Sequence, residues 1–89
     1  MKVKNNFIFR EIADTYLLIP TGEAALSIKG LISLSETGAF LYQRLQNGCT
    51  RDDLLSALTA EYDVSESVAG ADIDAFLGQM RELNMLTEE

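Results

Sequence analysis

Apolar and polar positions divide the chain into a first part with short apolar runs and a second part with helical spacing. Two early runs, Phe7–Ile12 and residues 16–19, are rich in strand-forming residues, and residues 13–15 between them are typical of a tight turn. Pro20 ends the second run, which suits a residue that cannot donate a ladder hydrogen bond. The two runs predict an antiparallel hairpin, and residues 31–34 predict a third strand.

The segment between the second and third predicted strands, residues 21–30, fits no single element. Gly22 and the pair Lys29-Gly30 are turn signals. The piece between them is compatible with a helical turn and with a short extra strand, and the pattern does not choose between these two alternatives.

Two short helices are predicted directly after the third strand. Ser35 is a good N-cap because its hydroxyl can accept a hydrogen bond from the free amides of the first turn, and Asn47-Gly48 marks the end of this helix. Thr50, with Asp53 three residues later, has the spacing of a capping box. It predicts a second helix over residues 51–62.

A third and longer helix is predicted to begin near Ser65 or Ser67 and to run to about Leu83. Its apolar residues recur at steps of three and four: Val68, Ala69, Ile73, Phe76, Leu77, Met80 and Leu83. Met85-Leu86 is expected to fold back on the core. Strands followed by helices predict an α+β fold, winged-helix-like, with a three-stranded antiparallel sheet and then three helices. Three strands cannot close a barrel, so the sheet must have free edges.

Length and composition narrow the class of protein. A chain of 89 residues predicts a single domain over residues 1–89 with a core of modest size. Hydrophobic residues make up 47% and charged residues 24%, which is typical of an ordinary globular protein. No apolar run reaches the roughly 18 residues of a membrane span, and no signal-peptide pattern is present. The single cysteine, Cys49, cannot form an internal disulfide, so a cytoplasmic location is expected.

The net charge of −7 is distributed unevenly. From Glu61 onward the chain has eight acidic residues and one basic residue, Arg81, so this part would repel a phosphate backbone. A DNA-binding winged helix remains an alternative because residues 36–62 have a helix-turn-helix pattern. Its recognition helix would carry clustered basic residues, but residues 50–62 contain only Arg51. A generic protein-interaction domain is a third possibility.

Catalytic chemistry is not indicated. The chain has no histidine and one cysteine, which excludes a Cys/His zinc site and a Ser-His or Cys-His nucleophile pair. It has no glycine-rich phosphate loop of known spacing. Cys49 has no basic residue next to it and is expected to be an unreactive thiol. We therefore expect no enzyme activity, no metal and no cofactor.

Several short motifs follow one another in a fixed order from the third predicted strand onward. In chain order they are Leu34, Glu36-Thr37-Gly38, Asn47-Gly48, Glu61-Tyr62-Asp63-Val64, Asp72, Phe76-Leu77 and Met85-Leu86. In this order and spacing, residues 31–86 resemble the PqqD-like family, small proteins named for coenzyme PQQ biosynthesis. The hairpin over residues 7–19 resembles the family only in general character.

The resemblance implies a winged-helix-like fold and a role in the synthesis of ribosomally made, modified peptides. Family members bind the leader of a precursor peptide and present it to a modifying enzyme, often a radical S-adenosylmethionine enzyme. The leader adds to the third strand and packs against the third helix. In this chain, the implied contacts are Leu31, Ile32, Ser33 and Leu34 on the strand, and Ile73, Phe76 and Met80 on the helix. These three helix residues are also compatible with plain core packing.

Overall fold

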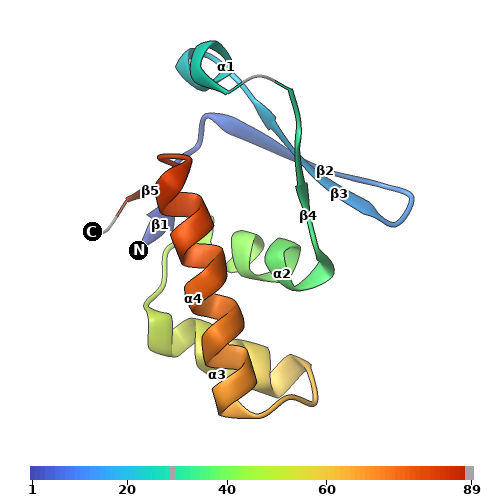
Figure 1. Cartoon of the computed structure of the whole chain (residues 1–89), viewed down its shortest axis with the longest axis vertical. Helices are drawn as coiled ribbons and strands as arrows, with labels where there is room; N and C mark the ends of the chain where they lie inside the picture. Colours follow the sequence, from blue (N-terminus) through green and yellow to red (C-terminus); the bar gives the residue numbers. More distant parts are fainter. Residues whose placement is uncertain (29, 88–89) are drawn as a thin grey trace.

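The fold is α+β, as the sequence predicts, with a three-stranded antiparallel sheet followed by helices. The computed structural model describes residues 1–28 and 30–87. The sheet consists of β2 (Phe7–Ile12), β3 (Thr15–Pro20) and β4 (Ile32–Leu34), in the spatial order β2-β3-β4. In Figure 1 the sheet lies above α2, and the long helix α4 runs beside β4. The expected third strand is confirmed, but it begins at Ile32, so Leu31 precedes it.

The three predicted helices are confirmed, and side-chain caps fix their N-termini. They are α2 (Glu36–Leu45), α3 (Arg51–Glu61) and α4 (Glu66–Glu82). The Ser35 hydroxyl accepts a hydrogen bond from the Gly38 amide at 3.0 Å. Thr50 and Asp53 form the reciprocal capping box, with bonds of 3.0 and 3.1 Å. The cap of α4 is Ser65, the first of the two serines that the sequence offered.

Loss of the Thr50 cap is expected to destabilise the protein without changing its fold. The Thr50→Ala variant removes the acceptor for the Asp53 amide, which lies near the exposed start of α3. We expect the free energy of unfolding to fall by about 1 kcal/mol. Urea unfolding measures this change, and Thr50→Ser, which keeps the hydroxyl, is the matched control. Equal losses in the two variants would contradict a capping role.

The segment over residues 21–30, for which the sequence allowed two alternatives, contains a helical turn, α1 (Glu23–Ser27), rather than an extra strand. The residues that the structure describes therefore contain four helices, one more than the sequence predicted. Gly22 precedes the turn with a φ of 56°, a backbone conformation that glycine adopts without strain. Lys29, part of the second turn signal, lies outside the described residues.

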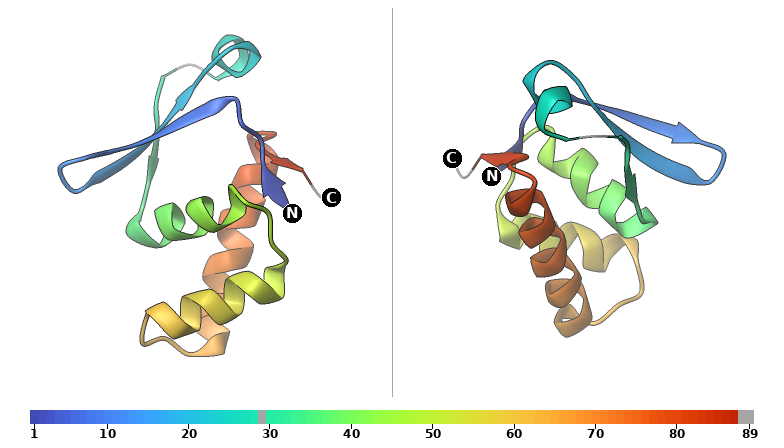
Figure 2. Two further views of the ribbon diagram at one scale, coloured as in Figure 1. Left: turned by 180° about the vertical axis from the view of Figure 1, so that it is seen from behind. Right: turned by 45° about the horizontal axis from the view of Figure 1, so that its top comes forward.

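The two ends of the chain meet in a small second sheet that the sequence did not predict. β1 (Lys2–Val3) pairs antiparallel with β5 (Leu86–Thr87), and the Lys4 amide donates to the Met85 carbonyl at 2.8 Å. Figure 2 shows this pair beside the upper end of α4. Met85 is fully buried and Leu86 is 8% exposed, which confirms the expected fold-back.

The hydrophobic core lies between the inner face of the sheet and the helices. Leu18 of β3 and Leu41 of α2 are fully buried, and the Tyr42 side chain is 1% exposed. The Phe9 ring stacks on the Tyr42 ring with 5.8 Å between centroids and so joins the sheet to α2. Burial of these side chains holds β4 at a fixed position beside α2 and α4.

Candidate functional site

One edge of the main sheet, β4, is open. It pairs with β3 on one side through Tyr16↔Leu34, Leu17↔Ser33 and Leu18↔Ile32. Within residues 1–28 and 30–87, no strand pairs with its other side. An open edge presents unpaired amides and carbonyls, which a further extended segment can bind.

The alternation of hydrogen bonds along the sheet, here called its hydrogen-bond phase, shows which residue of β4 directs its backbone amide and carbonyl away from β3. In an antiparallel ladder, directly opposite residues alternate between pairs that exchange two hydrogen bonds and pairs that exchange none. Thr21 donates to the Asn6 carbonyl at 2.9 Å, so the pair that follows along the ladder, Phe7↔Pro20, exchanges none. Because Pro20 lacks an amide hydrogen, it is suited to that position.

Counting from this pair places the bonds of Leu17 toward β2, where it faces Arg10. The two residues on either side of Leu17 on β3 therefore direct their amides and carbonyls toward β4, where they pair with Ile32 and Leu34. Ser33, opposite Leu17, must direct its own amide and carbonyl away from β3. Ser33 is thus the β4 residue whose backbone is available at the open edge, and its side chain is exposed.

Helix α4, which lies across from β4, has two adjoining stripes. One stripe is buried in the core and comprises Ala69, Ile73, Phe76, Leu77 and Met80. The other stripe is exposed and comprises Val68, Asp72, Ala75 and Gln79, at steps of four, three and four residues. The candidate contacts Ile73 and Met80 are fully buried. In this conformation they pack in the core beneath α4 and cannot contact a ligand.

A surface cavity of about 310 Å³ lies where α4 meets the N-terminal half of α2. Its lining residues are Ser35, Thr37, Gly38, Leu41, Asp72, Ala75, Phe76 and Gln79. Phe76, 6% exposed, is the candidate helix residue that reaches this cavity. A Cβ on Gly38 would lie 3.3 Å from the Ser35 hydroxyl and 3.6 Å from the Phe76 ring, so glycine keeps this space open.

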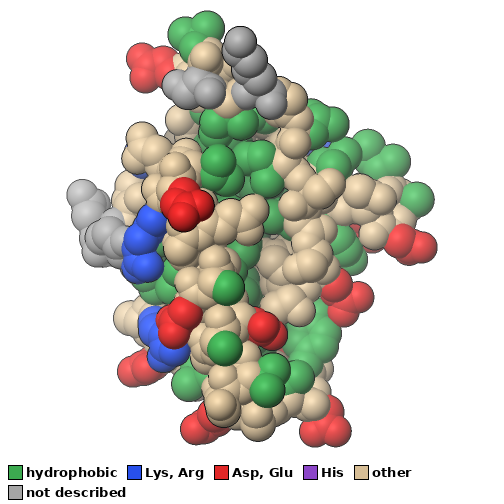
Figure 3. All heavy atoms as spheres, viewed as in Figure 1, with side chains coloured by type: hydrophobic (Ala, Val, Ile, Leu, Met, Phe, Trp, Pro, Cys, Tyr) green, Lys and Arg blue, Asp and Glu red, His purple; other side chains and the backbone are tan. Residues whose placement is uncertain are grey.

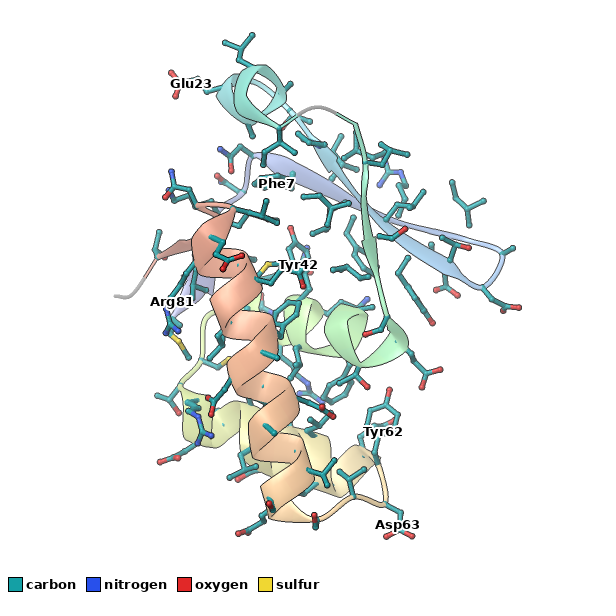
Figure 4. The ribbon with its side chains drawn as sticks, viewed as in Figure 1. Phe7, Glu23, Tyr42, Tyr62, Asp63 and Arg81 are labelled. Carbon is teal, nitrogen blue, oxygen red and sulfur yellow. The ribbon has the colours of Figure 1, made fainter. Side chains whose placement is uncertain are left out.

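The space between α4 and β4, called the gap below, has hydrophobic side chains at its base. Figure 3 shows hydrophobic side chains gathered between the upper half of α4 and β4. In Figure 4, Phe7 and Tyr42 lie in this gap, whereas Arg81 extends from the opposite side of α4. At the start of β4, Leu31 is 58% exposed. Of the proposed strand contacts, Leu34 is buried and Ile32 is half-buried, which leaves Leu31 and Ser33 as the exposed members.

An ion pair holds α3 against α4. Arg51 Nε and Nη2 donate to the two Asp74 carboxylate oxygens at 2.8 and 3.1 Å. Hydrogen bonding from Arg51 lowers the pKa of the Asp74 carboxyl. Arg51 is therefore already engaged, although it is the single basic residue of α3.

Other potential sites have little support. Burial raises the pKa of the Cys49 thiol, and the nearby Asp53 adds to this effect, so the unreactive protonated form is favoured. Among the residues that the structure describes, no three acidic or thiol side chains are grouped so that they could hold a metal ion. No described helix is both long enough and apolar enough to cross a membrane.

These features define a class: a winged-helix-like α+β protein with an open sheet edge beside a long helix. The chain belongs to the PqqD family, because the family profile described as coenzyme PQQ synthesis protein D (PqqD) matches residues 17–86. This confirms the resemblance seen in residues 31–86 and extends it into the hairpin. No curated protein sequence matches the chain.

Two solved structures share this fold. One is described as "TbiB1 in Complex with the TbiA(beta) Leader Peptide"; it has a TM-score of 0.78 and 20% identity and covers 100% of this chain and 98% of its own. The other is "Lasso peptide synthetase B1 complexed with the leader peptide", with a TM-score of 0.74, 24% identity, and coverage of 94% and 93%. At these identities, the similarity establishes the fold alone.

Proposed function

We propose that this protein is a peptide-binding adaptor that recognises the leader of a ribosomally made precursor peptide. The observation that carries the proposal is the outward-facing backbone of Ser33 on an open strand edge that lies beside α4. An extended leader can add to β4 through main-chain hydrogen bonds, with its side chains seated along the apolar gap. Two proteins of the same fold form complexes with leader peptides, which supports this assignment.

The adaptor is expected to act without catalysis and without a cofactor. It would present the bound leader to a separate peptide-modifying enzyme, for which the radical S-adenosylmethionine type is one candidate. The protein with 24% identity is named as part of a lasso peptide synthetase, so a different type of enzyme partner is equally open. We further propose that residues 1–89 act as one domain in this role.

The DNA-binding alternative has less support from the structure. A recognition helix needs basic side chains free to meet phosphates and bases. The single basic residue of α3, Arg51, is held in a two-bond ion pair with Asp74. The strongly negative net charge of −7 also opposes DNA binding.

Titration of the labelled protein with synthetic leader peptides tests the proposed function by amide NMR. The peptides to test are the N-terminal halves of any short open reading frames found next to this gene. We expect the Ser33 amide to shift downfield as it gains a hydrogen bond, with further shifts at Asp72, Ala75 and Gln79. Shifts confined to residues 36–62, with Ser33 unmoved, would place binding elsewhere and contradict the proposal. Duplex DNA added to the same labelled protein tests the alternative that the protein is a DNA-binding regulator.

A further inference from the structure

The cavity between α2 and α4 has a distinctive charge. Asp72 is the one charged residue in its lining, and the other polar groups there belong to Ser35, Thr37 and Gln79. No lysine or arginine lines it. In Figure 3, the prominent basic side chains lie along the flank of α4 that faces away from β4. A side chain that enters this cavity therefore meets a single negative charge in an otherwise neutral lining.

Asp72 differs from its neighbour two positions later on the same helix. The Asp74 carboxylate is neutralised by Arg51, with which it forms two hydrogen bonds. Within the part of the chain that the structure describes, the Asp72 side chain has neither an ion pair nor a hydrogen bond. Asp72 is exposed, so its carboxylate is available to a partner.

We propose that the peptide bound along β4 carries a lysine or arginine whose charge pairs with Asp72. This inference rests on the proposed function, because it names the chemistry of the peptide for the same site. The cavity of about 310 Å³ is large enough for a long basic side chain. Its methylene stem would lie against Ala75 and the edge of the Phe76 ring, with the charged head at the carboxylate.

The polar neighbours of Asp72 suit such a head group. Thr37 and Gln79 also line the cavity. A threonine hydroxyl and a glutamine amide oxygen can both accept hydrogen bonds from an ammonium or guanidinium group. The Ser35 hydroxyl accepts the Gly38 amide, so at least one first-turn donor of α2 is already satisfied. The cavity therefore offers acceptors to a cation and would disfavour an acidic side chain at that position of the peptide.

Charge reversal at Asp72 gives a sharp test. The probe is a displayed library of random 12-residue peptides, selected separately against the wild type, Asp72→Lys and Glu82→Lys. Glu82 is exposed on the same helix and does not line the cavity, so its variant has the same change in net charge and serves as the control. We expect wild-type and Glu82→Lys selections to favour Lys or Arg at one position. Asp72→Lys should favour Asp or Glu there.

Binding measurements with one selected peptide add a quantitative readout. Asp72→Asn should lower the affinity about two- to fivefold, and Asp72→Lys should lower it on the order of tenfold. The inference would be overturned if the wild type and Asp72→Lys selected the same peptides, or if the wild-type peptides had no preferred basic position. In that case, shifts of the Ser33 amide would still support strand addition. Selected peptides that leave the Ser33 amide unmoved, or a library that gives no binders, would instead contradict the proposed function itself.

Discussion

The Ser33→Pro variant is expected to lose peptide binding while the protein stays folded. The Ser33 amide points away from β3, so proline at this position removes no hydrogen bond from the sheet. It does remove the central donor that an added strand would use, and its ring obstructs close approach to the edge. We expect the affinity for a leader peptide to fall at least about tenfold. Titration calorimetry measures the affinity, and a circular dichroism melt checks the fold.

Ile32→Pro is the matched control because it changes the adjacent residue and removes an amide that points toward β3 rather than toward the open edge. The Ile32 amide bonds to Leu18, which is fully buried, so its loss leaves a carbonyl without a partner in the core. We expect a loss of about 1–3 kcal/mol in the free energy of unfolding. If Ser33→Pro unfolded the protein and Ile32→Pro did not, our assignment of the hydrogen-bond phase would be wrong.

A second large effect is expected from Met80→Ala, and it concerns stability rather than recognition. Met80 is fully buried, and its removal creates a cavity in the core beneath α4. We expect the free energy of unfolding to fall by about 2–5 kcal/mol. The remaining folded protein should bind a leader peptide with almost unchanged affinity, because Met80 has no surface in the gap. Urea unfolding and calorimetry below the midpoint measure the two quantities separately.

Gln79→Ala, one position earlier, should show the reverse pattern. Gln79 is exposed and lines the cavity between α2 and α4. Its replacement should change stability by no more than about 0.5 kcal/mol. Its effect on affinity should exceed that of Met80→Ala. A Gln79→Ala variant that lost stability but kept its affinity would show that we have assigned the two stripes of α4 incorrectly.

Most of the helical half of the fold could be predicted from the sequence because its helix starts are encoded locally. Ser35, Thr50 and Ser65 each accept a backbone amide three residues ahead, and such caps can be recognised without tertiary information. The β1–β5 pair could not be found in this way. Each of its strands has two residues, and they pair across almost the whole chain, so no local pattern marks them.

The candidate site was only partly predictable, and α4 shows why. Apolar spacing identifies the side of a helix that faces the core, but a ligand contacts the rim beside that side. Ile73 and Met80, the apolar-stripe residues on which the resemblance placed the leader contacts, are buried. Asp72 and Gln79 resemble ordinary solvent-facing residues. The repeat of Val68, Asp72, Ala75 and Gln79 at helical spacing was the available signal. Its meaning depends on where β4 and α2 lie, which sequence spacing does not show.

The pairing of Lys2 with Thr87 has a consequence for how this protein can be built into larger ones. Directly opposite residues in an antiparallel pair lie only about 5 Å apart, so Lys2 and Thr87 can be joined by a few residues. A circularly permuted version, with new ends at the Ala13-Asp14 turn, would leave β4 and α4 intact. For the same reason, the whole fold could be inserted into a surface loop of another protein and hold its open edge outward.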